Sequence, residues 1–161
     1  MTATQYFTQD RDIELSTLFY LQNQLATDWP GTTIVKSFAD AYAKDAVLPI
    51  VCVSLTETIP NRREVGSTTL EPQYLISVYL FCRSDGQRLD MASWLVTQLN
   101  TGWVHYQHSH MSGDKTQLDR VVDGRDQIIE FISNAKIDFG GQSDSKDRFR
   151  QNISFRVRKS S

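Results

Sequence analysis

The chain has 161 residues, of which 40% are hydrophobic and 22% are charged, and its formal net charge is −2. These values predict one soluble globular domain and argue against a protein that binds nucleic acid or membranes through a large excess of positive charge. No apolar run is long enough to span a bilayer, and the N-terminus lacks the basic start and apolar stretch of a secretory signal, so we expect a cytoplasmic protein.

The first predicted element is a helix over residues 12–29. Apolar side chains recur there at steps of three and four residues, which places them along one helix face. They are Leu15, Leu18, Leu21, Leu25 and Trp29. Pro30 and Gly31 end the helix, because proline cannot continue the hydrogen-bond ladder and glycine turns freely. Residues 32–38 are rich in β-branched side chains and predict a short strand.

Two core strands with a long polar connection are predicted next. The first lies within residues 47–58, where apolar and polar residues alternate. The second, residues 74–82, carries apolar side chains on both faces, so both faces are expected to be covered, by helices or by another subunit. The connection at about 57–73 is predicted to be a projecting loop, stiffened near its ends by Pro60 and Pro72.

A helix follows in the stretch "SDGQRLDMASWLVTQLN". Ser84 and Gln87 have the spacing of a capping box, in which each side chain satisfies a free backbone N–H group of the first turn. Gly102 is predicted to end the helix in a left-handed conformation. The expected apolar face comprises Leu89, Ala92, Leu95, Val96 and Leu99.

Residues 103–135 support two interpretations. Asp123-Gly124 is typical of a two-residue hairpin turn between strands, whereas the spacing of the apolar residues also fits a helical stripe. Because Gly124 disfavours an uninterrupted helix, we favour strands. The C-terminal part predicts a strand, a Gly/Ser/Asp loop and a last strand. We therefore predict one α+β domain over 1–161, with a largely antiparallel β-sheet flanked by an N-terminal helix and a central amphipathic helix.

No motif in the sequence predicts catalysis or a cofactor. Cys52 and Cys82 lie in apolar runs without metal-binding spacing, so we expect buried free thiols that are poor nucleophiles. A G-x-S-x-G motif is absent, as are the Gly-rich patterns that bind nucleotides.

Three histidines form the one cluster with ligand chemistry: His105, His108 and His110. His108 and His110 would share a strand face and could share a metal ion. The set lacks a cysteine or carboxylate of its own, with Asp114 the nearest carboxylate, so a polar, partly exposed strand is the preferred interpretation. A small metal-dependent enzyme or ligand-binding domain remains an alternative.

In the last predicted strand, two kinds of residue alternate with a period of two, so each kind lies on its own face. Apolar side chains occupy odd positions and arginines occupy even ones. This pattern predicts a basic strand face that is either solvated or turned toward an acidic partner or passing nucleic acid. The residues of that face are Arg148, Arg150, Arg156 and Arg158.

The stretches "VCVSLTETIPNRREVGSTTLEPQYLISVYLFCRSDGQRLDMASWLVTQL" and "DGRDQIIEFISNAKIDFGG…RQNISFRVR", with the preceding helix, resemble the tail terminator or neck proteins of long-tailed bacteriophages. The resemblance covers the layout of most of the chain and contains no sharp motif. It implies a β-sheet flanked by helices and a homo-oligomeric ring, usually hexameric, without catalysis or a cofactor.

Such a ring caps the tail tube, stops its elongation and presents the surface for head–tail joining. The implied partners are the tail tube protein and a head-completion protein, with DNA passing through as cargo. The implied location is the head-proximal end of the tail, after assembly in the bacterial cytoplasm. A capsid-side head-completion or adaptor protein is an alternative. From this chain's own residues we expect partner contacts at Arg62, Arg63, Glu64, Leu75, Tyr79 and Phe81.

Overall fold

The structure is a computed structural model with three helices and six strands in its described part. It describes residues 3–62, 64–66, 70–111, 114–137 and 148–160, of which 3–8 and 109–119 are described for the backbone alone. The helices are α1 (Ala3–Asp28), α2 (Phe38–Ala41) and α3 (Asp85–Asn100). The strands are β1 (Thr33–Val35), β2 (Ile50–Arg62), β3 (Leu70–Cys82), β4 (Trp103–Met111), β5 (Asp114–Ile137) and β6 (Phe149–Ser160).

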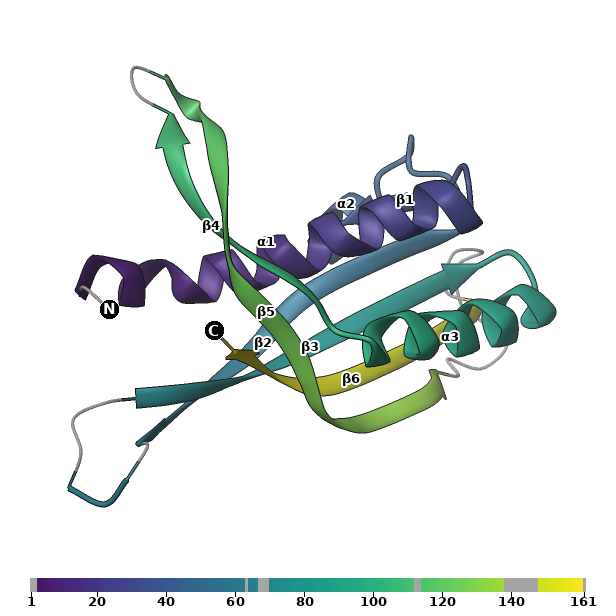
Figure 1. Cartoon of the computed structure of the whole chain (residues 1–161). Helices are drawn as coiled ribbons and strands as arrows, with labels where there is room; N and C mark the ends of the chain where they lie inside the picture. The colour runs from purple at the N-terminus through teal and green to yellow at the C-terminus, as the bar shows by residue number, and fades with distance from the viewer. Residues whose placement is uncertain (1–2, 63, 67–69, 112–113, 138–147, 161) are drawn as a thin grey trace.

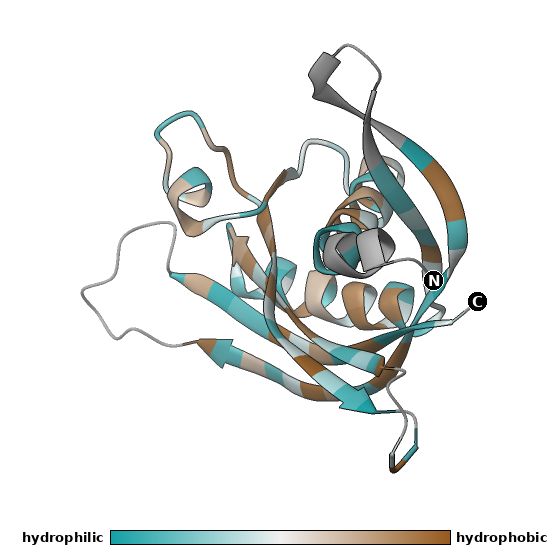
Figure 2. Cartoon of the chain, turned by 90° about the vertical axis from the view of Figure 1, so that its left-hand side faces the viewer, coloured by the Kyte–Doolittle hydropathy of each residue, from teal (hydrophilic) through white to brown (hydrophobic). Residues whose placement is uncertain are grey.

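The six strands form one curled sheet in the order β1-β2-β3-β6-β5-β4 (Figure 1). Only the short β1 is parallel to its neighbour, and every other described pairing is antiparallel. Helices α1 and α3 lie within the curl (Figure 2). The predicted α+β class is confirmed. No helix in the described ranges combines the length and apolarity that a membrane span requires.

The main core lies between the concave face of the sheet and helices α1 and α3. Alternate residues of β3 enter it, as the sequence predicts; they are Tyr74, Ile76, Val78, Leu80 and Cys82. The odd-numbered apolar residues of β6 do the same, with Ile153, Phe155 and Val157 buried and Phe149 packed at the margin. Period-two patterning therefore predicts the inward face of both strands correctly.

The convex face is covered at one end by α2 and the segment that follows it. Ser37 caps α2, since its Oγ accepts the Asp40 N–H at 3.2 Å, so the predicted strand at 32–38 ends early. Beneath α2 lies a second small core of Ala41, Ile50, Cys52 and Phe81. The expectation that β3 is covered on both faces is confirmed at this end, where the cover comes from the same chain.

Both long helices differ in detail from their predictions. Helix α1 begins at Ala3 rather than at residue 12. In α3, Ser84 Oγ accepts the Gln87 N–H at 3.1 Å, but the Gln87 side chain accepts the N–H of Arg83 instead of that of Ser84. Leu89 is 53% exposed, and Met91 takes a place in the core instead. Gly102 has the predicted positive φ, +73°.

The predicted loop at 57–73 is largely a β-hairpin. Strands β2 and β3 continue to pair as far as Arg62 and Leu70, with Pro60 opposite Pro72. Beyond Tyr74, β3 no longer pairs with β6, so residues 59–62 and 70–73 form a two-stranded extension, the β2–β3 arm. Figure 1 shows this arm leaving the body of the sheet at lower left. The loop prediction was wrong because polar residues and two prolines are atypical of core strands. They are tolerated in this strand pair, because its outer edges have no partner strand that needs a backbone N–H group.

Strand β5 runs directly through Asp123-Gly124, so the predicted hairpin turn at this dipeptide is wrong. The strand interpretation of this region is confirmed and the helical one is not. Between the pairs Val104/Arg125 and Tyr106/Val122, β5 contains one more residue than β4. Gly124 has a φ of +84°, so the dipeptide forms a bulge that twists the strand instead of reversing it. The predicted Gly/Ser/Asp loop at 139–146 lies outside the described residues.

Candidate functional site

Side chains from the first half of α1 form hydrogen bonds with the outer edge of β4, which is the last strand of the sheet. Asp12 Oδ1 accepts the backbone N–H of His108 at 2.9 Å. Ser16 Oγ accepts the Tyr106 N–H at 2.9 Å and donates to the Tyr106 carbonyl at 3.3 Å. The Arg11 guanidinium donates to the His108 carbonyl. These side chains take the place of a further strand, because they satisfy backbone groups that a neighbouring strand would otherwise bond.

The same half of α1 also bonds the edge of β2. Glu14 Oε2 accepts the Leu55 N–H at 2.9 Å, and Glu14 Oε1 lies 3.0 Å from Lys36 Nζ. Thr58 Oγ1 donates to Asp10 Oδ1 at 3.2 Å. Polar residues four apart lie on one flank of a helix, so one flank of α1 bonds β2 and another bonds β4. We call these two sets of contacts the seam.

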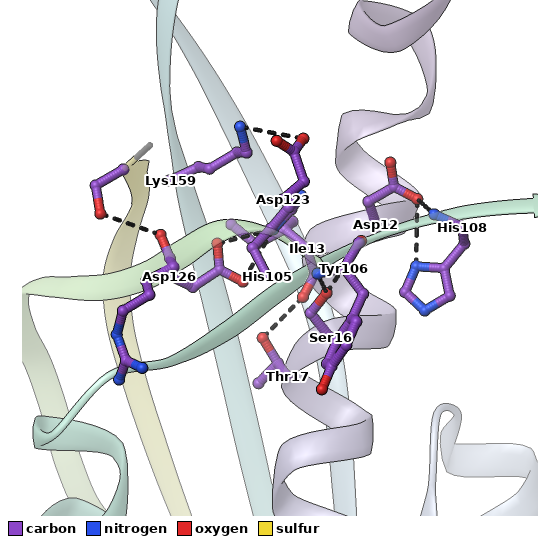
Figure 3. Close-up of polar contacts among 12 residues, drawn as sticks. Asp12, Ile13, Ser16, Thr17, His105, Tyr106, His108, Asp123, Asp126 and Lys159 are labelled. Atoms are coloured by element: carbon purple, nitrogen blue, oxygen red, sulfur yellow. Dashed lines mark hydrogen bonds and ion pairs between the residues drawn. The ribbon is translucent and has the colours of Figure 1, made fainter. Parts of the chain in front are cut away.

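His105 forms a buried pair with Asp126. Its Nδ1 lies 2.9 and 3.1 Å from the two carboxylate oxygens of Asp126, and both side chains are almost wholly buried (Figure 3). Burial raises the pKa of Asp126 above its ordinary value, while His105 and Lys159 act to lower it. The interaction with the His105 ring therefore offsets part of the free-energy cost of removing the Asp126 carboxylate from water.

His108 lies across the seam from Asp12, with Nδ1 3.3 Å from Asp12 Oδ1 (Figure 3). The His108 side chain is also buried, so the predicted partly exposed strand is wrong for both of these histidines. Each has its own carboxylate partner on a different element. In the part of the chain with described side chains, no three metal-binding groups come together, and the side chain of His110 lies outside that part.

The two cysteines are free and buried, as predicted. Burial raises the pKa of Cys52 to about 11 and that of Cys82 to about 12, and nearby Arg150 and Arg88 offset only part of this effect. Neither thiol has the lowered pKa that an activated nucleophile needs.

We therefore expect both thiols to resist modification in the folded protein. With Ellman's reagent at neutral pH, native protein should release much less than one equivalent of thiolate product, and denatured protein should release two. Rapid labelling of one cysteine in native protein would contradict the burial argument. The denatured sample provides the control for reagent and stoichiometry.

The predicted partner residues divide into exposed and buried groups. Arg62 and Glu64 are exposed at the end of the β2–β3 arm, and Arg63 lies outside the described residues. Leu75 and Tyr79 are half-buried on the convex face. Phe81 is fully buried beneath α2, with its ring centroid 5.7 Å from that of Tyr42. The prediction was wrong for Phe81, because the same chain already covers it.

The predicted basic face of β6 is not uniform. Arg148 and Arg158 are exposed, whereas Arg156 Nη1 lies 2.8 Å from Glu130 Oε1 on β5. Arg150 is 7% exposed, and its guanidinium lies over the rings of two aromatic residues, at 4.5 Å from the centroid of Phe81 and 5.4 Å from that of Phe38. Arg150 therefore belongs to the packing under α2, and its assignment to an exposed basic face was wrong.

Sequence reasoning missed Asp12 and Ser16, and it placed Asp126 in a solvated charged turn rather than in a buried pair with His105. Asp12 and Ser16 lie four positions apart and so share one helix flank, but the stretch around them is already polar, with Asp10, Arg11 and Glu14, and nothing local distinguishes them. Their partners are about 90 residues away in the chain, and no local pattern identifies them.

Comparison with models of known protein families and with curated proteins finds no match to this chain. The functional argument therefore starts from three features of the molecule. They are the β2–β3 arm, the convex face with its exposed arginines, and the seam with its buried histidines.

Proposed function

We propose that the protein is a structural virion assembly protein that forms a homo-oligomeric ring on the tube of a long bacteriophage tail. The β2–β3 arm is the observation that carries this proposal. It extends from two core strands, so its position is held by the sheet (Figure 1). At its end, Arg62 and Glu64 are exposed and Val65 is fully exposed. A projecting arm with charged residues and an uncovered apolar side chain suits contact with another protein better than binding of a small molecule.

The convex face supplies a second surface for contact with neighbours. At the margin of α2 it carries the half-buried Tyr79 of β3, whose ring centroid lies 4.7 Å from that of Phe38. Further along this face are the half-buried Leu75 of β3 and the exposed Arg158 of β6. Two separate surfaces on one subunit suit a head-to-tail contact, and such contacts close into rings when the rotation between subunits allows it. In this proposal the ring is hexameric, its neighbours are the tail tube protein and a head-completion protein, and DNA only passes through it.

Size-exclusion chromatography with light scattering tests the ring, and co-sedimentation with purified tail tubes tests its partner. We expect an oligomer, or a monomer that assembles on tubes. A strict monomer at every concentration and salt condition, with no tube binding, would contradict the proposal.

Electron microscopy of particles lacking the protein tests its position in the neck. Overlong tails would support a terminator that stops tube growth. Tails of normal length that never join heads would instead support the capsid-side adaptor.

Reversing charge on the arm separates its contact role from folding. Arg62→Glu should change the free energy of unfolding by no more than about 0.5 kcal/mol, because Arg62 is exposed and substitutions at exposed positions rarely cost more. The same change should weaken binding to tail tubes or to the head partner in co-sedimentation. Lys44→Glu is the matched control, since Lys44 is exposed and lies outside the arm. If both variants bind as strongly as the native protein, the arm does not contact a partner and only connects β2 to β3.

A further inference from the structure

The β2–β3 arm has two outer edges without a partner strand in the described part of the chain. Residues 59–62 and 70–73 pair only with each other there, because β1 pairs with residues 50–52 of β2 and β6 reaches along β3 only to Tyr74. Figure 1 shows the end of the arm apart from the body of the sheet and from the start of α1. An uncovered strand edge normally offers backbone groups with which a strand of another molecule can pair. Both edges of the arm are therefore places where one copy of the chain could join another.

The register of the arm shows where its backbone groups point. Pro60 lies directly opposite Pro72. Opposite residues of an antiparallel pair alternate between pairs that exchange two N–H···O bonds and pairs that exchange none. Because proline has no N–H group, Pro60 and Pro72 cannot exchange hydrogen bonds, and the pairs on either side of them are the bonded ones. The backbone nitrogen and carbonyl group of each proline therefore face outward, away from the opposite strand.

Each outer edge consequently lacks a hydrogen-bond donor at its proline. Outward-facing backbone groups recur at every second residue of a strand. The outward positions are Thr58, Pro60 and Arg62 on β2, and Leu70 and Pro72 on β3. A further strand would accept a hydrogen bond from an N–H group at each of these positions. The proline withholds that bond, and its ring occupies the space in which the acceptor would lie.

Two prolines are needed to block both edges of a two-stranded arm. The two edges face in opposite directions, so a single proline would leave the other edge open to pairing. Pro60 is exposed and Pro72 is half-buried, so a need for packing in the core does not account for them. Their placement at one opposed pair closes the two edges at the same level of the arm.

We propose that Pro60 and Pro72 block both edges of the β2–β3 arm, so that the arm binds a folded surface through its side chains and does not pair with an extended strand. The arm of a second copy is one of the strands that this block excludes. The end of the arm suits binding through side chains, because Arg62 and Glu64 are exposed there and Val65 is fully exposed. That the arm has a partner rests on the proposed function, whereas the block of its edges does not.

Pro60→Val combined with Pro72→Val tests the block, because it restores an N–H group on each outer edge. Valine adopts extended backbone readily, so we expect the variant to fold, as checked by circular dichroism. In light scattering over a range of concentrations, its weight-average mass should rise at least about twofold above that of native protein at the same concentration. An unchanged mass at every concentration would overturn the proposal. If the double variant does not fold, each single variant opens one edge and decides the proposal in the same way.

Asn61→Val combined with Gln73→Val is the matched control. It places the same β-branched side chain at one neighbouring position on each strand, but the N–H groups of these residues already bond within the arm, so no outward donor is added. This variant should keep the mass of the native protein, and association equal to that of the proline variant would overturn the proposal. Each comparison is with native protein whatever its own mass. A failure of the ring proposal is therefore distinguishable from a failure of the edge block.

Discussion

Asp126→Ala is expected to lower the free energy of unfolding by about 3 kcal/mol. The substitution removes the only described carboxylate bonded to the His105 ring and leaves a buried imidazole without its partner. Because burial raises the pKa of Asp126, the intact pair adds little net stability compared with an apolar pair of similar size. Breaking the pair is costly all the same, since one polar group then stays buried alone. Urea unfolding followed by tryptophan fluorescence measures the change.

Asp123→Ala is the matched control for this prediction. It makes the same chemical change three residues earlier on β5, at a side chain that is 47% exposed and lies 3.3 Å from Lys159 Nζ. A partly exposed ion pair of this kind contributes about 0.5 kcal/mol or less. Equal losses of unfolding free energy in the two variants would mean that the buried Asp126–His105 pair stabilises the fold no more than the partly exposed Asp123–Lys159 pair does.

Gly102→Ala is expected to destabilise the protein by about 3 kcal/mol. Gly102 has a φ of +73°, a conformation that alanine adopts at a cost of about 1 kcal/mol. An added Cβ would also lie 2.8 Å from the backbone oxygen of Asp126, which is held in β5 and cannot move aside freely. The close approach of the α3–β4 junction to β5 therefore requires glycine, and thermal or urea unfolding measures the loss.

Gly31→Ala isolates the steric part of that cost. Gly31 also follows a long helix and has a φ of +87°, but no described atom lies within 4 Å of an added Cβ. Only the cost of the left-handed conformation, about 1 kcal/mol, is then expected. If Gly102→Ala costs no more than Gly31→Ala, the contact with Asp126 is not tight enough to constrain the fold.

The sequence by itself determined the features that arise within a few residues of each other. Alternation in β3 and β6 predicts which side chains enter the core, because the two faces of a strand are sampled at every second residue. Ser84 and Gly102 mark the ends of α3, because capping depends on local backbone geometry. These local rules were sufficient for the α+β class and for the two long helices.

The tertiary structure alone decided the features that depend on distant partners. Whether Asp123-Gly124 turns or bulges depends on β4, and whether residues 59–62 form a loop or a strand depends on pairing with β3. Phe81 and Arg150 are covered by α2 rather than by a second subunit because the sheet brings β3 and β6 side by side beneath it. The seam joins residues about 90 positions apart, and only the curl of the sheet brings α1 to the edge of β4.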